Sequence, residues 1–163
     1  MSELSFREAI TSDVDRCFEI ESMAYAGEEA ATKEKILLRI QTYPTGFIVL
    51  ENQDEIIGFI NCGTTDNVVL SDEEFKALVG HDPAGKYVVV MSVVVDPKYQ
   101  RKGMASRLLT EFIKRMKALH KSEIYLICQS EFIPLYAKHD FVLLGESDSS
   151  HGGLKWHEMS LSL

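Results

Sequence analysis

The segment VVVDPKYQRKGMASRLL, residues 93–109, places an almost entirely apolar stretch directly before a short cationic loop and an amphipathic stretch. Residues 87–95 contain one polar side chain, Ser92, which is typical of a central strand covered on both faces. The segment therefore predicts a buried strand, a tight loop and a helix. The apolar face of that helix recurs at helical spacing and comprises Met104, Leu108, Leu109, Phe112, Ile113, Met116 and Leu119.

The loop QRKGMA, residues 100–105, has three features that suit a diphosphate group. The start of a helix presents unpaired N–H groups and a partial positive charge. Gly103 lets the backbone approach a ligand without a Cβ atom in the way, and Arg101 and Lys102 add positive charge. A plain turn with a solvated basic patch is the alternative. The sequence contains neither the GxxxxGK(S/T) pattern of a P-loop nor the GxGxxG pattern of a dinucleotide-binding fold.

The rest of the chain alternates between strand and helix patterns without a repeat or a linker. We expect strands at residues 4–8, 47–50, 56–62, 87–95, 124–128, 141–145 and 155–161, and helices after residues 13, 32, 71, 103 and 133. This order predicts a mixed α/β fold with a central sheet of about seven strands flanked by helices, in one domain that spans residues 1–163. We expect residues 65–86 to form a lid over a small pocket.

The composition narrows the class of protein. Seventeen Lys and Arg against 25 Asp and Glu give a net charge of −8, which argues against a nucleic-acid partner. Three widely spaced cysteines and scattered histidines predict neither a disulfide framework nor a metal site. The sequence shows no apolar signal segment and no stretch of membrane-spanning length, so we expect a cytoplasmic protein without membrane contact.

Gln100-x-x-Gly103-x-Ala105 after an apolar strand resembles the coenzyme A pyrophosphate loop of the GNAT superfamily of N-acetyltransferases, and the order of elements is also that of GNAT proteins. Four further segments resemble the arylalkylamine (serotonin) N-acetyltransferase branch. These are Phe18-Glu-Ile-Glu21 with Ala24-Tyr25, His81-Asp-Pro-Ala-Gly85, Ile133-Pro-Leu-Tyr136 through Phe141, and Trp156-His-Glu-Met159.

The resemblance implies a GNAT fold, acetyl-CoA as cosubstrate and no metal. It implies that Tyr136 is the acid that protonates the departing thiolate. A backbone N–H at the end of the central strand would polarise the acetyl carbonyl, which requires a splay or a bulge there. The implied coenzyme A-binding residues are Val93, Val94, Val95, Gln100, Arg101, Lys102, Gly103, Met104, Ala105 and Ser106.

The general base is missing from the place where the branch carries it. Two histidines of that branch correspond to Val89 and Met91 here. An alkyl ammonium with a pKa near about 10 must lose a proton before it attacks, so some route for the proton is required. The sequence leaves open a water chain or one of four side chains, namely Glu28, Glu29, His81 and Glu131. Cys128, Phe47 and Trp156 are interpreted as core residues.

Three functions stay open at this point. The first is acetylation of a primary amine on a small molecule, such as an arylalkylamine or a polyamine, by direct attack in a ternary complex. The second is acetylation of a protein N-terminus or lysine. The third is an acyl-CoA-binding module that has lost its base. A homodimer is a further open possibility.

Overall fold

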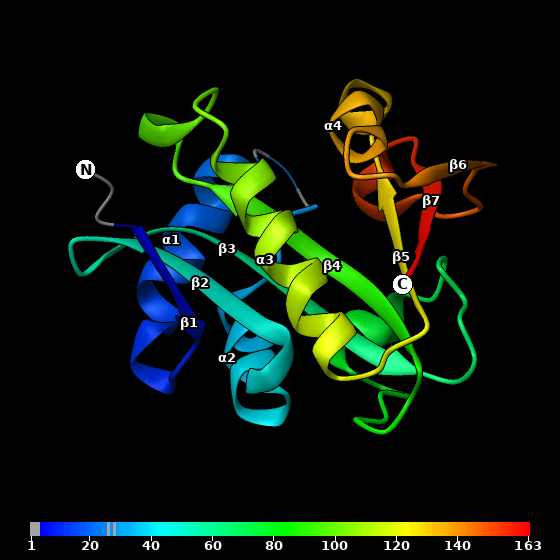
Figure 1. Ribbon diagram of the computed structural model, residues 1–163, viewed down its shortest axis with the longest axis horizontal. Helices are drawn as coiled ribbons and strands as arrows, with labels where there is room; N and C mark the ends of the chain where they lie inside the picture. Colours follow the sequence, from blue (N-terminus) through cyan, green and yellow to red (C-terminus); the bar gives the residue numbers. More distant parts are fainter. Residues whose placement is uncertain (1–3, 26, 28) are drawn as a thin grey trace.

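The computed structural model describes residues 4–25, 27 and 29–163, and within them seven strands form one mixed sheet in the order β1-β2-β3-β4-β5-β7-β6 (Figure 1). The parallel pair is β4 and β5, and the other neighbours are antiparallel. The predicted mixed sheet of about seven strands is confirmed. The strands are β1 (Leu4–Glu8), β2 (Phe47–Asn52), β3 (Glu55–Thr65), β4 (Tyr87–Val95), β5 (Glu123–Cys128), β6 (Val142–Glu146) and β7 (His157–Ser162).

Helices cover both faces of the sheet. The long helix α3 (Met104–Ala118) lies on one face, and α1 (Val14–Ala24) and α2 (Lys33–Thr42) lie together on the other (Figure 1). The short helix α4 (Ile133–Ala137) follows β5. Among the described residues, no helix combines the length and the apolar character needed to cross a bilayer.

Two apolar clusters hold these layers together. The cluster under α3 contains its buried side chains Leu108, Leu109 and Phe112, as the helical stripe in the sequence predicts. The second cluster joins Cys17 and Ile20 of α1 to the opposite face of the sheet. Strands β2 and β3 are therefore buried on both faces of the sheet.

The two central strands separate toward their carboxyl ends. Strand β4 pairs with β3 along its length, but of the described strand residues only Tyr87–Val89 pair with β5. Figure 1 shows β4 and β5 diverging from that shared start. The splay that the sequence analysis required at residues 93–95 is present, and the carboxyl-terminal part of β4 borders an opening between the strands.

A bulge in β4 changes which face its side chains occupy. Asn61 of β3 pairs with Ser92, but the next residue of β3, Cys62, pairs with Val90, so Met91 is the extra residue. Before the bulge, Val90 faces the cluster under α3, whereas after it Val94 faces the cluster under α1. One inserted residue reverses the alternation of a strand. The bulge therefore directs Ser92 toward α1.

Candidate active site

A cleft of about 580 Å³ opens between the separated ends of β4 and β5. It continues past the loop after β4 to the first turn of α3. Nine of the ten residues that the sequence assigned to coenzyme A line it, and Lys102 does not. The Lys102 ammonium lies 5.9 Å from the ring centre of Tyr99. The nine are Val93, Val94, Val95, Gln100, Arg101, Gly103, Met104, Ala105 and Ser106.

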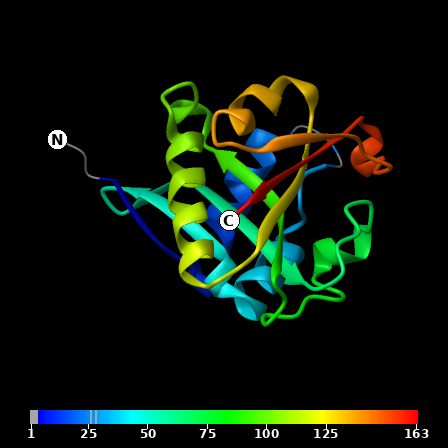
Figure 2. The same cartoon turned by 45° about the vertical axis from the view of Figure 1, so that its right-hand side comes forward.

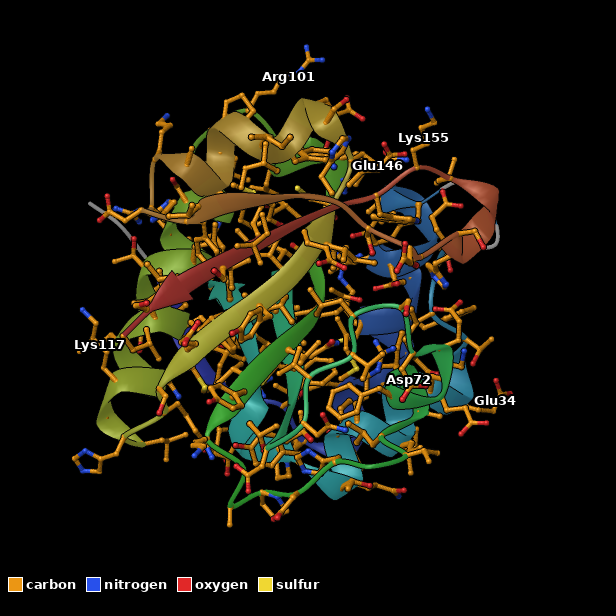
Figure 3. All side chains as sticks on the ribbon, turned by 90° about the vertical axis from the view of Figure 1, so that its right-hand side faces the viewer. Glu34, Asp72, Arg101, Lys117, Glu146 and Lys155 are labelled. Atoms are coloured by element: carbon orange, nitrogen blue, oxygen red, sulfur yellow. The ribbon has the colours of Figure 1, made fainter. Side chains whose placement is uncertain are left out.

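The first turn of α3 faces this cleft with its backbone donors. Arg101 and Gly103 both adopt a left-handed conformation, with φ of 61° and 81°, and this sharp turn starts the helix at Met104. The N–H of Arg107 donates to the carbonyl of Gly103 at 3.1 Å, so the donors of the three preceding residues are free for a ligand. The Arg101 side chain extends away from the body of the protein (Figure 3). The free backbone N–H groups could therefore bind an anion here, with Arg101 at the rim.

Two side chains of the loop hold it in place. The amide Nε2 of Gln100 donates to the carbonyl oxygen of Val95 at 3.0 Å, which ties the loop to the end of β4. The hydroxyl of Ser106 lies 2.7 Å from Nε2 of His139, just after α4. Below the loop, buried Asp96 accepts a hydrogen bond from Arg16 of α1 at 2.6 Å. These contacts position the first turn of α3 relative to both central strands.

A second, smaller cavity of about 120 Å³ adjoins the cleft. Its walls come from α1, α2 and the bulged part of β4, together with the 3₁₀ turns η3 (Glu73–Ala77) and η6 (His151–Gly153). The two cavities share six lining residues, which mark the place where they meet. These are Tyr25, Glu29, Val93, Ile127, Tyr136 and Trp156.

Glu21 of α1 places a buried carboxylate in the smaller cavity. The residue is 1% exposed, and its Oε2 accepts hydrogen bonds from the N–H of Ala31 at 2.7 Å and from the hydroxyl of Ser92 at 3.5 Å. Its Oε1 has no hydrogen-bond partner among the residues that the structure describes. Burial raises the pKa of Glu21 despite these hydrogen bonds and the positive charge of Arg39. A carboxyl group with a raised pKa and a free oxygen suits a proton acceptor.

Tyr136 of α4 stands where the two cavities meet. Its ring is buried and packs edge-on against Phe141, with the ring centres 5.7 Å apart. Its hydroxyl makes no hydrogen bond within the described part of the chain, so it is free to donate to a ligand. Burial, assisted by the nearby Cys128, raises the pKa of Tyr136 above its ordinary value. The phenol therefore stays protonated at neutral pH, as a proton or hydrogen-bond donor must be.

The smaller cavity also carries basic side chains. Lys35 and Arg39 of α2 and Lys76 of η3 all line the smaller cavity. Arg39 is 3% exposed, and its Nε donates to the carbonyl oxygen of Lys76 at 3.0 Å. Burial lowers the pKa of Arg39 to about 10, although Glu21 opposes the change. The cavity therefore holds charges of both signs, which come from different elements.

Three segments that are distant in sequence meet at one side of this cavity. In η6, Nδ1 of His151 lies 2.6 Å from Oε1 of Glu73. Nε2 of the same ring donates a hydrogen bond to the carbonyl oxygen of Glu29 at 3.0 Å. Figure 2 shows the η3 and η6 segments on the same side of the molecule. Of residues 65–86, only Lys76 lines this cavity, so a lid formed by that segment stays a prediction.

The other base candidates differ in position. His81 lines neither cavity, since it contacts Tyr43 and the N–H of Thr64 near the opposite end of β4. Glu131 lines the cleft alone, Glu29 lines both cavities, and Glu28 lies outside the described residues. No group of three or more acidic, histidine or cysteine residues in the described part of the chain could hold a metal ion.

Sequence reasoning missed several residues of this site. Glu21 stands on the buried side of α1 with Cys17 and Ile20, and a charged residue among apolar neighbours was the available signal. Trp156 is buried, as the core interpretation expects, yet it also lines both cavities. Phe47 is a core residue stacked on Phe59. Cys128 lines the cleft, and burial raises the pKa of its thiol to about 11, which disfavours a nucleophilic role.

Comparison with solved structures identifies the fold. The loading GNATL domain of CurA from Lyngbya majuscula matches with a TM-score of 0.86, 17% identity, and coverage of 98% of this chain and 97% of that one. The GphF GNAT-like decarboxylase in complex with isobutyryl-CoA matches with a TM-score of 0.84, 16% identity, and coverage of 97% and 98%. A phosphinothricin acetyltransferase from Sinorhizobium meliloti in complex with acetyl-CoA gives a TM-score of 0.72, 22% identity, and coverage of 99% and 89%. The fold is the GNAT fold.

The sequence itself matches the acetyltransferase (GNAT) family over residues 8–141. The chain belongs to this family of acetyltransferases. A search of curated protein sequences gave no match. The family resemblance seen in residues 100–105 is thus confirmed.

We expect Gly103→Val to weaken coenzyme A binding about tenfold, as measured by calorimetry. A left-handed backbone costs a side chain about 1–2 kcal/mol, and the loop must move to relieve that strain, which misaligns the N–H groups of residues 104–106. Gly80→Val is the matched control. Gly80 has a φ of 88°, and like Gly103 it has open space where a Cβ would stand, but it lines neither cavity. Equal coenzyme A affinity in the two variants would contradict this role of Gly103.

Proposed function

We propose that this protein transfers the acetyl group of acetyl-CoA to the primary amine of a small molecule by direct attack in a ternary complex. The observation that carries the proposal is the buried Glu21 carboxylate. Glu21 lines a small cavity that meets the cleft at Val93 and Tyr136, and its Oε1 has no hydrogen-bond partner among the described residues. An amine in this cavity would lie between a proton acceptor and the place where an acetyl group would lie.

Glu21 takes one proton from the substrate ammonium, and the hydrogen bonds to its Oε2 hold the carboxylate in place. The amine then forms a bond with the acetyl carbon while the carbon–sulfur bond breaks. A backbone N–H of residues 93–95, beyond the part of β4 that pairs with β5, polarises the acetyl oxygen. Tyr136 donates a proton to the departing sulfur. Of the two protons that the ammonium loses, one ends on the thiol and one reaches solvent.

The size and charge of the smaller cavity bear on the open alternatives. Its volume of about 120 Å³ favours a small acceptor over a protein N-terminus or lysine, which needs a longer groove. Glu21 supplies a base, which weakens the case for a binding module without one. Three cationic side chains disfavour a polyamine. The rings of Tyr25, Tyr136 and Trp156 keep an arylalkylamine open.

A second candidate is decarboxylation of a carboxyacyl-CoA. The specific observation that favours it is Arg39, whose buried guanidinium lines the smaller cavity and would bind a carboxylate. One structural neighbour is described as a GNAT-like decarboxylase. In this reading the cavity holds the end of the acyl chain in place of an amine.

Thiol release separates these functions. We expect free coenzyme A to form from acetyl-CoA when at least one small primary amine is added, and we expect no release with peptides that carry N-terminal amines or lysines. Malonyl-CoA, tested alone, reports decarboxylation through release of carbon dioxide. Coenzyme A binding without turnover of any amine or peptide would contradict the proposal and favour the binding module.

Three further predictions stand beside this proposal. We propose that residues 1–163 act as one domain and that the protein works in the cytoplasm. Its three cysteines are buried and free, in keeping with a reducing compartment. A homodimer stays open, and light scattering would decide it.

A further inference from the structure

The charged side chains of the smaller cavity come from different elements of the fold. Helix α1 and the segment after it contribute Glu21 and Glu29, whereas α2 and η3 contribute Lys35, Arg39 and Lys76. A ligand that fills this cavity contacts side chains of both signs, because the space is only about 120 Å³. The acceptor must therefore suit both a carboxylate and cations.

Arg39 is a buried cation without a carboxylate partner in the described part of the chain. Its Nη1 donates to Oδ1 of Asn61 at a long 3.4 Å, and its Nη2 makes no hydrogen bond to any described residue. No ion pair joins it to Glu21 within the described residues, although the two charges influence each other's pKa values. A buried charge is costly unless it is paired, so this guanidinium is arranged to receive an anion.

Lys76 is a second cation of this cavity. Its side chain is 16% exposed, and its ammonium lies 3.9 Å from the nearest carboxylate oxygen, that of Glu73. Burial lowers the pKa of Lys76, even though Glu73 favours its charged form. Arg39 and Lys76 also share a hydrogen bond through the Lys76 carbonyl, which fixes one beside the other.

We propose that the acceptor is a small α-amino acid or a zwitterion of similar size, whose ammonium binds Glu21 and whose carboxylate binds Arg39 and Lys76. This inference rests on the proposed N-acetyltransferase function and names its substrate class. A zwitterion pairs both buried charges at once and brings no net charge into the cavity. A simple amine leaves the guanidinium unpaired, and its own positive charge is repelled by the basic side chains.

The orientation of a bound amino acid in this cavity also fits the reaction. Glu21 is held next to Ser92 and the bulged part of β4, close to the residues that the cavity shares with the cleft. The basic residues lie on α2 and η3, which contribute nothing to the cleft lining. An amino acid bound in this orientation turns its amine toward the acetyl group and its carboxylate away from it.

The test compares matched acceptors with the wild-type protein. Alanine, alaninamide and ethylamine present the same amine with a carboxylate, with a neutral amide and with neither. Glycine, serine, valine and methionine are each compared in the same way with their amide and with the amine that lacks the carboxylate. We expect kcat/KM for the best amino acid to exceed that of its amide and its amine by about 10- to 100-fold, because the analogues leave buried charges unpaired.

Variants assign the effect to Arg39 and Lys76. We expect Arg39→Met and Lys76→Met to raise KM for the amino acid about tenfold or more while changing KM for the matching amine little. The ratio of the two substrates is measured within each variant, so a partly folded sample does not alter it. Arg39→Lys is expected to recover part of the preference. Lys33→Met, an exposed change on α2 outside both cavities, should leave the preference unchanged.

The outcomes separate this inference from the proposed function. Amines acetylated as well as their amino acids would overturn the amino-acid assignment and leave the N-acetyltransferase standing. If no acceptor is turned over, the proposed function fails, and a melting shift of the coenzyme A-loaded protein then tests binding alone. Stabilisation by alanine but not by ethylamine, lost in Arg39→Met, would support the carboxylate site, and its absence would overturn it. Carbon dioxide release from malonyl-CoA that depends on Arg39 would assign the carboxylate to the acyl chain, against this inference.

Discussion

Replacing Glu21 with glutamine is expected to lower kcat by about 10²- to 10⁴-fold while the protein becomes more stable at neutral pH. The amide preserves the size of the side chain and can still accept hydrogen bonds from Ala31 and Ser92. It cannot take a proton from the substrate ammonium. Steady-state kinetics with saturating acetyl-CoA measures the first effect, and the melting temperature measures the second.

The pH dependence of both effects follows from the raised pKa of Glu21. The base must be ionised, so kcat/KM is expected to rise with pH as Glu21 loses its proton above its ordinary pKa of 4.5, and this limb should be absent in Glu21→Gln. The folded protein holds the Glu21 proton to higher pH than the unfolded chain does. The stability that this proton supplies is complete below pH 4.5 and is lost as pH rises through the raised pKa. At neutral pH the buried carboxylate therefore destabilises the fold, and the amide relieves that cost.

Glu34→Gln provides the control for this experiment. Glu34 lies on the exposed side of α2, at the outer edge of the molecule in Figure 3, and lines neither cavity. Its substitution is expected to leave kcat and the pH profile unchanged. An unaltered acidic limb in Glu21→Gln would show that another group accepts the proton, and Glu29, which lines both cavities, would be the next candidate.

Tyr136→Phe is expected to lower kcat by about 10²- to 10³-fold while the Kd for coenzyme A changes less than about threefold. The ring keeps its edge-on contact with Phe141, so packing is retained and only the hydroxyl is lost. Because burial raises the pKa of Tyr136, the phenol stays protonated throughout the assay range, and its loss should not remove a limb of the pH profile. This distinguishes the acid from the base.

Tyr125→Phe is the matched control for the hydroxyl. Tyr125 lies on β5 beside Tyr87, at the end where β4 and β5 are still paired, and it lines neither cavity. Its substitution should leave kcat near the wild-type value. If Tyr136→Phe also retained the wild-type kcat, a water molecule or another donor would have to protonate the thiolate.

The apolar run at residues 87–95 and the helical stripe after Gly103 were sufficient to predict β4, α3 and the loop between them. A strong periodicity of apolar residues is a local property of the sequence, so it predicts strands and helices without knowledge of the tertiary structure. The turn between β2 and β3 was less well predicted. A five-residue loop was expected, but the strands continue to Asn52 and Glu55, and Gln53 and Asp54 form a two-residue turn with positive φ. Strand pairing extends into polar residues because the partner strand supplies their hydrogen bonds.

The proposed coenzyme A loop, residues 100–105, could be predicted from the sequence for the same reason. A loop motif of six residues specifies a backbone turn, and backbone N–H groups at a helix start need no distant partner. The smaller cavity could not be predicted from the sequence, because its lining residues come from separate elements that include α1, α2, η3, β4 and η6. The requirement for a splay of β4 could be deduced from chemistry. The sequence has Val89 and Met91 where the resembling branch carries histidines, and this difference did not point to Glu21.

The sequence by itself predicted the main strands and helices and suggested a coenzyme A loop. It also showed Val89 and Met91 where the resembling branch carries histidines. Only the tertiary structure brings Glu21, the base that we propose, beside Ser92 of β4. Met91 is the inserted residue of a bulge, and that bulge turns Ser92 toward Glu21 on α1, 71 positions away in the chain. The physical reason is that a strand's alternation is reversed by one unpaired residue, and pairing is set by β3 and not by the sequence of β4 alone. Likewise, the pKa of Glu21 and the unpaired guanidinium of Arg39 arise from burial, which exists only once the layers are packed.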